Sequence, residues 1–312
     1  MTHHHTHGTD HGHHDHHHHE VTSLNRAFII GISLNIAFVL AEFAAGFWYE
    51  SLGLLSDAGH NLSDVASLIL AMLAFRLAKV NPTPKYTYGL KKSTILVSLL
   101  NAVILLVAVG IIISESVEKF FHPQPVEGGA IAWVAGIGVV INGITAWLFM
   151  KDKDKDLNVK GAYLHMAADA LVSVGVVISG IVIIYTGWYI VDPIIGIVIA
   201  GVIVYSTWGL LRDSLRLSLD GVPAGTDVGK VEKAIRSVEG VKDLHHLHIW
   251  GISTTETALT VHIVIENTDR MQEIKEEIKH ELLHVGVQHV TLEFELTSAP
   301  CHDGCGEILS KD

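Results

Sequence analysis

The sequence predicts an all-α transmembrane domain of six helices, followed by a small α+β domain. Three observations lead to this fold class. The 312 residues are 49% hydrophobic and only 17% charged, a composition typical of membrane proteins. Apolar stretches of about 20 residues, the length that a bilayer core demands, recur six times. After residue 211 they cease, and shorter helix and strand patterns follow.

The six apolar stretches are rich in Gly, Ala and Ser, small residues that let membrane helices approach closely. They cover residues 27–47, 54–75, 93–114, 130–150, 161–186 and 189–211. Lys and Arg gather in the second and fourth loops and after the last stretch, whereas the first and fifth loops have neither. The positive-inside rule therefore predicts that both termini lie in the cytoplasm.

The chain divides into four segments by composition. Residues 1–22 form an arm with eleven histidines and little to pack, which we expect to be disordered and to bind metal loosely. A purification tag is the alternative, disfavoured because Thr, Gly and Asp interrupt the histidines. The transmembrane domain spans residues 23–212. A cytoplasmic domain at 213–298 and a flexible tail at 299–312 complete the chain.

The C-terminal domain has its own periodic pattern. Amphipathic stretches at 226–240 and 269–286 predict helices, whereas 241–253, 257–267 and 287–296 read as strands. The order helix, strand, strand, helix, strand suits two helices layered on an antiparallel sheet, as in ferredoxin-like domains.

Composition also bears on partners. The formal net charge is −12 and no basic patch occurs, which argues against nucleic acid. The two cysteines, Cys301 and Cys305, flank His302 in the tail. A structural disulfide is disfavoured in the reducing cytosol, and a thiolate metal site with a borrowed ligand is the preferred interpretation over two idle thiols.

Ionisable residues inside two apolar stretches are the central functional signal. His60 and Asp64 stand four residues apart in one stretch, and His165 and Asp169 repeat that spacing 105 residues later. A carboxylate at membrane depth costs about 2.5 to 3.5 kcal/mol. Two imidazoles and two carboxylates form a ligand set that tetrahedral zinc accepts, and the dication neutralises both aspartates. The alternative is that a single His–Asp pair only forms hydrogen bonds to a neighbouring helix. The presence of two such pairs disfavours it.

Other polar residues also fall within the spans. Asp57 lies one turn before His60 and either guides ions or protons to the site or caps its helix. Asn35, Glu42 and Asn142 are isolated, and interhelical hydrogen bonds are the preferred interpretation.

The motifs "LLSDAGHNLSD" and "GAYLHMAAD", with six spans and the α-β-β-α-β tail, resemble the cation diffusion facilitator family over nearly the whole chain. The resemblance implies proton-coupled antiport of zinc out of the cytoplasm by a homodimer. His60, Asp64, His165 and Asp169 would then be the transport site. Histidine in both pairs resembles the zinc-selective branch of the family.

The resemblance further implies a metal-sensing, dimerising C-terminal domain with zinc as a regulatory ligand. Residues that match its binding pattern are His245, His262, Glu293 and Glu295, with carboxylates in the last strand where some relatives have a histidine and an aspartate.

Histidine recurs throughout this domain. The positions are His245, His246, His248, His262, His280, His284 and His289. Strand alternation predicts His246 and His248 on one face and His245 on the other. Exposed histidines in such a domain are usually only solvated.

We therefore predict a zinc exporter that is not an enzyme, embedded in a lipid bilayer, with the bacterial inner membrane as its expected location. Cadmium and cobalt fit the same ligands. A membrane sensor that binds zinc without moving it is the alternative. An intramembrane metallohydrolase is disfavoured because we expect no His-Glu-x-x-His helix and because the protein supplies all four ligands. The imidazole pKa near 6.5 suits exchange of a proton for zinc.

Overall fold

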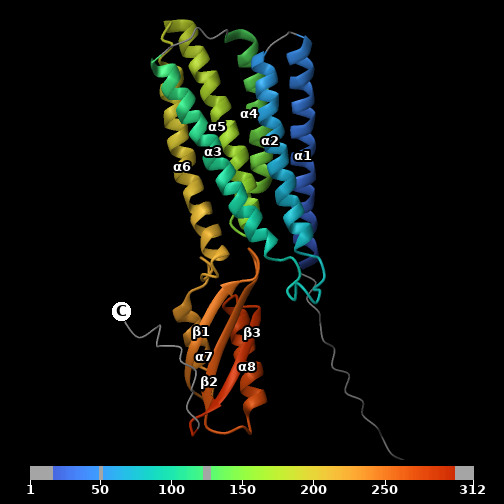
Figure 1. Ribbon diagram of the computed structural model, residues 1–312, viewed down its shortest axis with the longest axis vertical. Helices are drawn as coiled ribbons and strands as arrows, with labels where there is room; N and C mark the ends of the chain where they lie inside the picture. The colour runs from blue at the N-terminus through green and yellow to red at the C-terminus, as the bar shows by residue number, and fades with distance from the viewer. Residues whose placement is uncertain (1–16, 49–51, 122–127, 299–312) are drawn as a thin grey trace, which may run out of the picture.

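The computed structural model describes residues 17–48, 52–121 and 128–298. In these ranges, long helices lie side by side in one bundle and a small domain follows at one end (Figure 1). The helices of the bundle are α1 (His17–Trp48), α2 (Leu52–Leu77), α3 (Ser93–Phe121), α4 (Gly128–Met150), α5 (Leu157–Thr186) and α6 (Val191–Ser218). All six predicted spans therefore correspond to helices.

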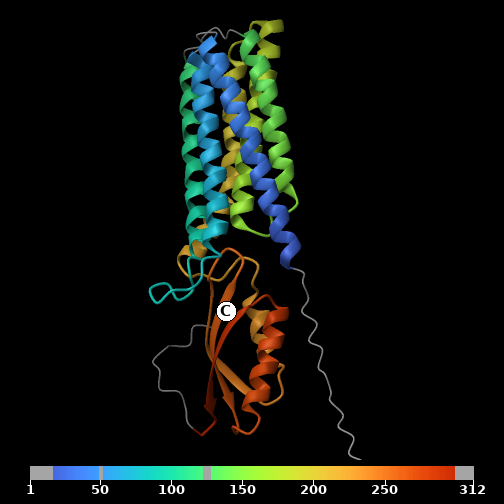
Figure 2. The same cartoon turned by 90° about the vertical axis from the view of Figure 1, so that its right-hand side faces the viewer.

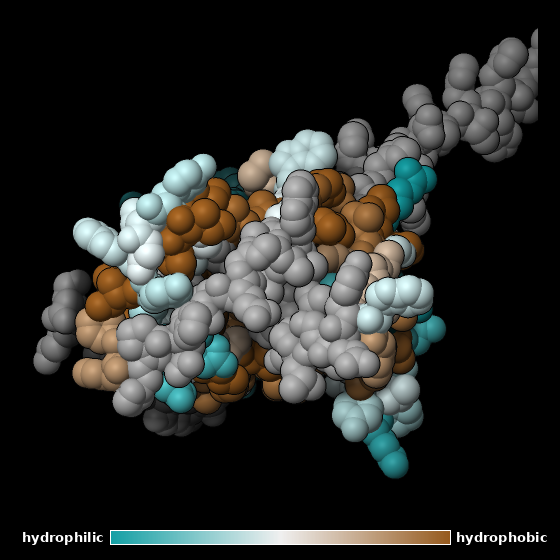
Figure 3. Space-filling view, turned by 90° about the horizontal axis from the view of Figure 1, so that it is seen from above, coloured by the Kyte–Doolittle hydropathy of each residue, from teal (hydrophilic) through white to brown (hydrophobic). Residues whose placement is uncertain are grey.

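The bundle is apolar on its outside. Helical stretches long and apolar enough to cross a membrane are Arg26–Ala45, Ser93–Phe121, Leu157–Thr186 and Pro193–Ser218, and Ala135–Met150 is a shorter apolar helix. Large apolar side chains such as Leu40, Ile111 and Val198 are exposed on this surface. Figure 3, which looks onto the molecule from the bundle end, shows apolar residues between the grey ones. The predicted helical transmembrane domain is confirmed.

The first helix begins earlier than expected. Residues 1–22 were assigned to the disordered arm, yet α1 begins at His17 and so includes the last six of these residues. Each residue added to an existing helix gains a backbone hydrogen bond without a new nucleation cost. The long apolar helix therefore propagates outward into the polar segment. Residues 1–16 lie outside the described ranges.

Small residues bring the helices close together, as their frequency predicted. A Cβ atom on Gly196 of α6 would collide with the Ser116 hydroxyl of α3. A Cβ on Gly175 of α5 would likewise meet Ile199 of α6 and lie 2.8 Å from Ile195. These glycines allow α3 and α5 to pack directly on α6.

The C-terminal domain has the predicted element order. It contains α7 (Val228–Arg236), β1 (Val241–Gly251), β2 (Thr257–Ile265), α8 (Met271–His284) and β3 (His289–Leu296). Its core is formed by side chains of both helices and of the sheet, among them Val231, Ile235, Leu259, Ile263, Ile278 and Leu282. Figure 2 shows the helices on one side of the sheet.

The prediction of a fully antiparallel sheet is wrong for the last strand. The strand order is β1-β2-β3, in which β1 and β2 pair antiparallel but β2 and β3 pair in parallel. The chain passes from β2 through α8 before it enters β3. Such a helical crossover returns the chain to the starting end of the sheet, so that the next strand runs parallel to the one before.

The predicted alternation of the β1 histidines is also wrong. The pairing register shifts between His245 and His248, and His246 adopts a φ of 51° in the left-handed region. A bulge of this kind inserts a residue that breaks the two-residue period of the strand. As a result the rings of His245 and His246 both contact His262, at centroid distances of 5.2 and 4.7 Å, while His248 is exposed.

Candidate metal centres

One candidate centre lies between α2 and α5, inside the bundle. His165 Nε2 stands 2.7 Å from Asp64 Oδ1 and 3.7 Å from Asp169 Oδ2. Asp64 comes from α2, whereas the other two residues stand one helical turn apart on α5, which places them on a common face. The geometry thus joins residues about 100 positions apart in the sequence, as the paired spacing predicted.

The three side chains are enclosed by protein. Asp64 is 1% exposed and His165 6%, and one ligand atom from each of the three lies within 4.8 Å of the others. Asp64 Oδ2 has no hydrogen-bond partner in the described part of the chain. Two carboxylates this close repel each other unless a cation or protons neutralise them. A divalent ion or bound protons can therefore occupy this centre, in competition.

The remaining predicted membrane residues are located only by their backbone. His60 and Asp57 belong to α2, with His60 one turn before Asp64. Their side chains lie outside the described part of the structure, so the fourth ligand and the proposed ion path stay predictions.

Other buried polar side chains join neighbouring helices of the bundle. Asn35 of α1 donates to Thr145 at 3.3 Å and to the Met166 sulfur at 3.8 Å. Asn61, next to His60 on α2, donates to Glu42 of α1 at 2.7 Å. The predicted interhelical hydrogen bonds are confirmed for Asn35 and Glu42.

Asn142 differs from these two residues. It is buried at 2% exposure, but its side-chain oxygen has no hydrogen-bond partner among the described residues. The interhelical hydrogen bond predicted for it is not observed at that atom.

A hydrophobic cluster separates the centre from the C-terminal domain. It includes Phe28, Leu68, Phe149 and Met166, from α1, α2, α4 and α5. The Phe28 ring stacks at a tilt on Phe149, with centroids 4.8 Å apart. These side chains are almost fully buried and form a tightly packed layer on that side of the centre.

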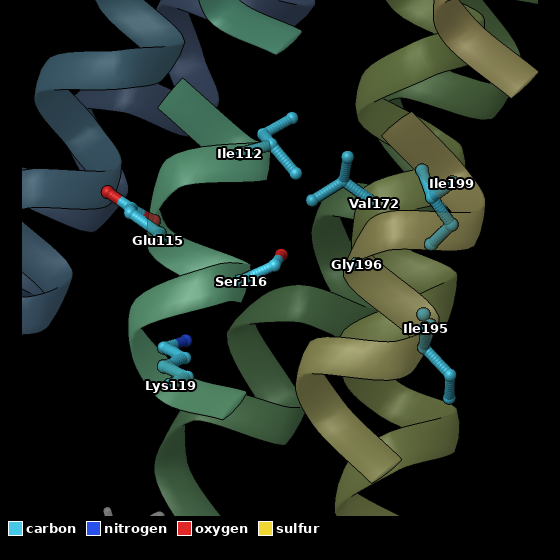
Figure 4. Close-up of a pocket in the computed structure, with 9 residues that line it drawn as sticks. Ile112, Glu115, Ser116, Lys119, Val172, Ile195, Gly196 and Ile199 are labelled. Atoms are coloured by element: carbon cyan, nitrogen blue, oxygen red, sulfur yellow. The ribbon is translucent and has the colours of Figure 1, made fainter. Parts of the chain in front are cut away.

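A cavity of about 150 Å³ lies elsewhere in the bundle, between α3, α5 and α6 (Figure 4). It is lined by Glu115, Ser116 and Lys119 of α3 together with apolar side chains of the other two helices. None of the three described centre residues lines it, so the cavity is not the metal centre.

A second candidate centre lies on the sheet of the C-terminal domain. His262 of β2 stands opposite His245 of β1 in the pairing register and opposite Glu293 of β3. Its Nδ1 atom lies 2.6 Å from Glu295 Oε1 and its Nε2 atom 3.4 Å from Glu293 Oε2. His245 Nε2 is 3.3 Å from Glu295 Oε2. All four predicted residues therefore come together.

The sequence interpretation missed a fifth member of this group. His246 joins His245 and His262 in a three-imidazole set, in which one ring nitrogen of each residue lies within 4.8 Å of the other two. We call the five residues the sheet cluster; they are His245, His246, His262, Glu293 and Glu295. The adjacent histidine pair was visible in the sequence, but the bulge that turns both toward one face was not.

The predicted tail site cannot be described. Cys301, His302 and Cys305 all lie outside the described residues, as do histidines 3–16 of the N-terminal arm. A site formed by the tail and the arm stays a prediction.

The turn between β1 and β2 connects the two domains. Glu256 accepts two hydrogen bonds from Lys91, at 2.8 and 2.6 Å, and the Thr254 amide donates to Thr94 at 3.1 Å. The Thr254 hydroxyl donates to Asp156.

Asp156 is the N-cap of α5 and accepts from the Asn158 amide at 2.7 Å. The C-terminal domain therefore contacts the start of the helix that carries His165 and Asp169.

A further ion pair joins the loop before α3 to the segment after α6. Lys92 donates to Asp220, and both side chains are partly exposed. Exposed ion pairs contribute at most about 1 kcal/mol each. The partly buried hydrogen bonds of Thr254 are therefore the stronger part of this junction.

The Asp156 contact predicts a dependence on pH. Burial raises the pKa of Asp156 above its ordinary value of 3.8, against the hydrogen bonds from Thr254, Asn158 and Val159. A raised folded-state pKa means that this stabilisation is complete below the unfolded pKa and is lost as pH rises through the folded one. The Asp156→Asn variant keeps a side-chain oxygen that can cap α5 but has no carboxyl group to titrate. Its stability relative to the native chain should therefore rise as the pH increases above the unfolded pKa of 3.8.

Thermal unfolding of the full chain in chelator, measured across this pH range, checks the prediction. The exposed Asp154→Asn variant serves as the matched control, since it changes the same charge at a solvated position. An Asp156→Asn difference that does not vary with pH would show that this carboxyl does not titrate in the range.

Comparison with known proteins identifies the family. Residues 28–217 match the model of the cation efflux transmembrane domain, and residues 223–296 match that of the cation efflux protein cytoplasmic domain. A Bacillus subtilis protein named cadmium, cobalt and zinc/H(+)-K(+) antiporter is 36% identical over 290 residues, covering 91% of this chain and 93% of the relative. The zinc transporter ZitB of Escherichia coli is 34% identical over 280 residues, covering 89% of this chain and 88% of the relative.

Among solved structures, the metal-bound C-terminal domain of the CzcD transporter from Cupriavidus metallidurans is 38% identical. It covers 23% of this chain and 100% of its own, with a TM-score of 0.22. The two family models together match almost the whole described chain, and the curated relatives match it nearly end to end. This chain is an integral, multi-pass membrane protein that belongs to the cation efflux family of transporters.

Proposed function

We propose that this protein exports Zn²⁺ from the cytoplasm in exchange for protons. The observation that carries the proposal is the enclosed centre of Asp64, His165 and Asp169 between two membrane helices. Uncompensated carboxylates are costly at this depth, and a transported dication or protons offset that cost. The names of the Bacillus subtilis and Escherichia coli relatives support the same activity.

The ligand types favour zinc as the substrate. Imidazole nitrogen and carboxylate oxygen bind zinc at about 2.0 to 2.2 Å, and nitrogen donors disfavour magnesium and calcium. His60 supplies the fourth ligand in this proposal. Cadmium and cobalt are accepted by the same donor types, as the name of the Bacillus subtilis relative supports.

Proton exchange follows from the ligands. Imidazole must be neutral to bind a metal ion, and carboxylates must be ionised. Arrival of zinc from the cytoplasm therefore expels protons from the histidines and aspartates, and protons from the other side displace the ion. The hydrophobic cluster around Phe28 and Phe149 must open for loading and close for release.

The C-terminal domain has a regulatory role in this proposal. Zinc at the sheet cluster neutralises Glu293 and Glu295 and holds three imidazoles together, and the contact from Thr254 to Asp156 passes the change in this domain to α5. The match to a family dimerisation domain supports a homodimer as the working unit. In this proposal both termini lie on the cytoplasmic side of a bacterial inner membrane.

Two segments complete the proposal. The N-terminal arm of histidines raises the local metal concentration near the entrance. Cys301, His302 and Cys305 of the tail bind a further ion with a ligand borrowed from that arm. Both would act before transport and neither is needed for the membrane centre.

Zinc accumulation in proteoliposomes tests the function. With the C-terminal domain outside and an acidic lumen, we expect zinc to enter the vesicles and to stop entering when an ionophore collapses the proton gradient. A membrane sensor gives a different result, since it binds zinc without moving it. Zinc binding by the reconstituted protein with no accumulation above empty liposomes would therefore reject the exporter.

A further inference from the structure

The outer side of α8 carries two histidines that lie outside both centres described above. His280 and His284 stand four residues apart in the sequence His-Glu-Leu-Leu-His on α8. The expectation that no helix carries a His-Glu-x-x-His pattern is therefore wrong for this domain. Ile278 and Leu282 of the same helix are buried in the domain core, whereas the His280 side chain is 68% exposed. The pair is therefore open to solvent, on the face of α8 turned away from the sheet.

The two imidazoles converge on one point. Their Nε2 atoms lie 3.4 Å apart and their ring centroids 4.5 Å apart, with planes at 82°. Two nitrogen ligands bound at about 2.0 to 2.1 Å to a tetrahedral zinc ion stand about 3.3 to 3.4 Å from each other. The observed separation is thus the separation that chelation requires, and it is reached without any change of the helix.

A carboxylate lies at the outer nitrogen of the first ring. Glu281 Oε1 is 3.5 Å from His280 Nδ1, the ring nitrogen that does not face His284. In metal sites, a ligating histidine commonly donates this second N–H to a carboxylate, which fixes its tautomer and orientation. Glu277 stands three and seven residues before the two histidines, which places it on the same helical face.

We propose that His280 and His284 form a divalent-metal site on α8. The site binds zinc, or another divalent ion that prefers nitrogen ligands, from solution. Glu281 acts as a positioning residue for His280, and water completes the coordination. The exposed pair is unlike a hydrolytic zinc site, which holds the ion with three protein ligands in a shaped cavity. With two protein ligands the ion exchanges readily with solvent.

This site is separate from the sheet cluster. His262 alternates along β2 with Val261 and Ile263, which face the helices and are buried. The sheet cluster therefore lies on the face of the sheet opposite α8. The proposal requires neither zinc transport nor binding at that cluster, so its test is independent of both.

Amide hydrogen exchange of α8 in the full-length protein tests the site directly. Chelation across one turn must be broken before the turn opens, so zinc at ten times its dissociation constant should slow local exchange by about tenfold. The matched control exchanges two neighbours, Lys279→His with His280→Lys. It keeps composition and charge but puts the histidines five residues apart, about 140° around the helix.

The proposal expects zinc to slow exchange of α8 in the native chain and in His262→Ala, and not in the exchanged control. Equal slowing in the native chain and the control would attribute the effect to another site and overturn the proposal. No slowing in the native chain would overturn it as well. If the exchanged control does not fold, His284→Gln replaces it, since this exposed position tolerates a neutral polar side chain.

Discussion

Asp64→Asn is expected to reduce zinc transport by about 100-fold or more, because the loss of even an outer partner of a metal ligand costs 10- to 100-fold. The substitution preserves the shape of a side chain that is 1% exposed and removes its charge. Asp169→Asn should have the same effect, since both carboxylates lie near His165. Initial rates of zinc uptake into proteoliposomes measure the loss.

The folded state of these variants should remain intact. Removal of one of two neighbouring buried carboxylates relieves a desolvation cost, so Asp64→Asn should unfold at a temperature no lower than that of the native chain in the absence of metal. Ser67→Ala is the control on the same helix, at a buried polar residue one turn on. It should transport at nearly the native rate. Native-rate transport by Asp64→Asn would place the transport site elsewhere.

His262→Ala is expected to abolish most of the stabilisation of the C-terminal domain by zinc. His262 contacts Glu293 and Glu295 and faces the rings of His245 and His246, so its loss removes the central ligand of the sheet cluster. A bound ion at 100 times its dissociation constant stabilises the folded state by about 2.7 kcal/mol. Unfolding of the full chain with and without zinc measures this difference.

The control for this experiment is His248→Ala. His248 belongs to the same strand but is exposed and outside the sheet cluster. Its substitution should leave the zinc-dependent stabilisation within about 0.5 kcal/mol of the native value. If His248→Ala loses as much zinc-dependent stabilisation as His262→Ala, zinc binds to the histidines of this strand non-specifically and not at the sheet cluster.

Much of the fold could be read from the sequence because the bilayer limits the choices. A chain that crosses hydrocarbon must be helical in stretches of about 20 apolar residues, so six such stretches predict six helices. Within them, ionisable side chains are so costly that Asp64, His165 and Asp169 stand out by residue type alone. Their convergence between α2 and α5 follows from the repeated spacing.

Features that depend on backbone detail could not be predicted. The bulge at His246 reverses the face of one histidine, and only its φ of 51° shows why. The parallel pairing of β3 depends on which edge of the sheet the crossover reaches. Periodicity identifies which residues share a face within one element but not how separate elements dock.

The contact between domains is the most consequential of these missed features. Thr254 sits in a short polar turn and Asp156 at the start of a helix, and neither has a distinctive sequence signal. In the structure the Thr254 hydroxyl binds the carboxylate that caps α5. The C-terminal domain therefore contacts the helix that holds two residues of the membrane centre.

Zinc and proton movements recorded together in the same vesicles test the central claim most directly. A zinc gradient is imposed with no initial difference in pH, and a dye reports the lumenal pH while zinc entry is followed. The account predicts that protons leave the lumen as zinc enters, and that Asp64→Asn and Asp169→Asn stop both movements. Zinc entry with no change in lumenal pH would contradict proton exchange at this centre.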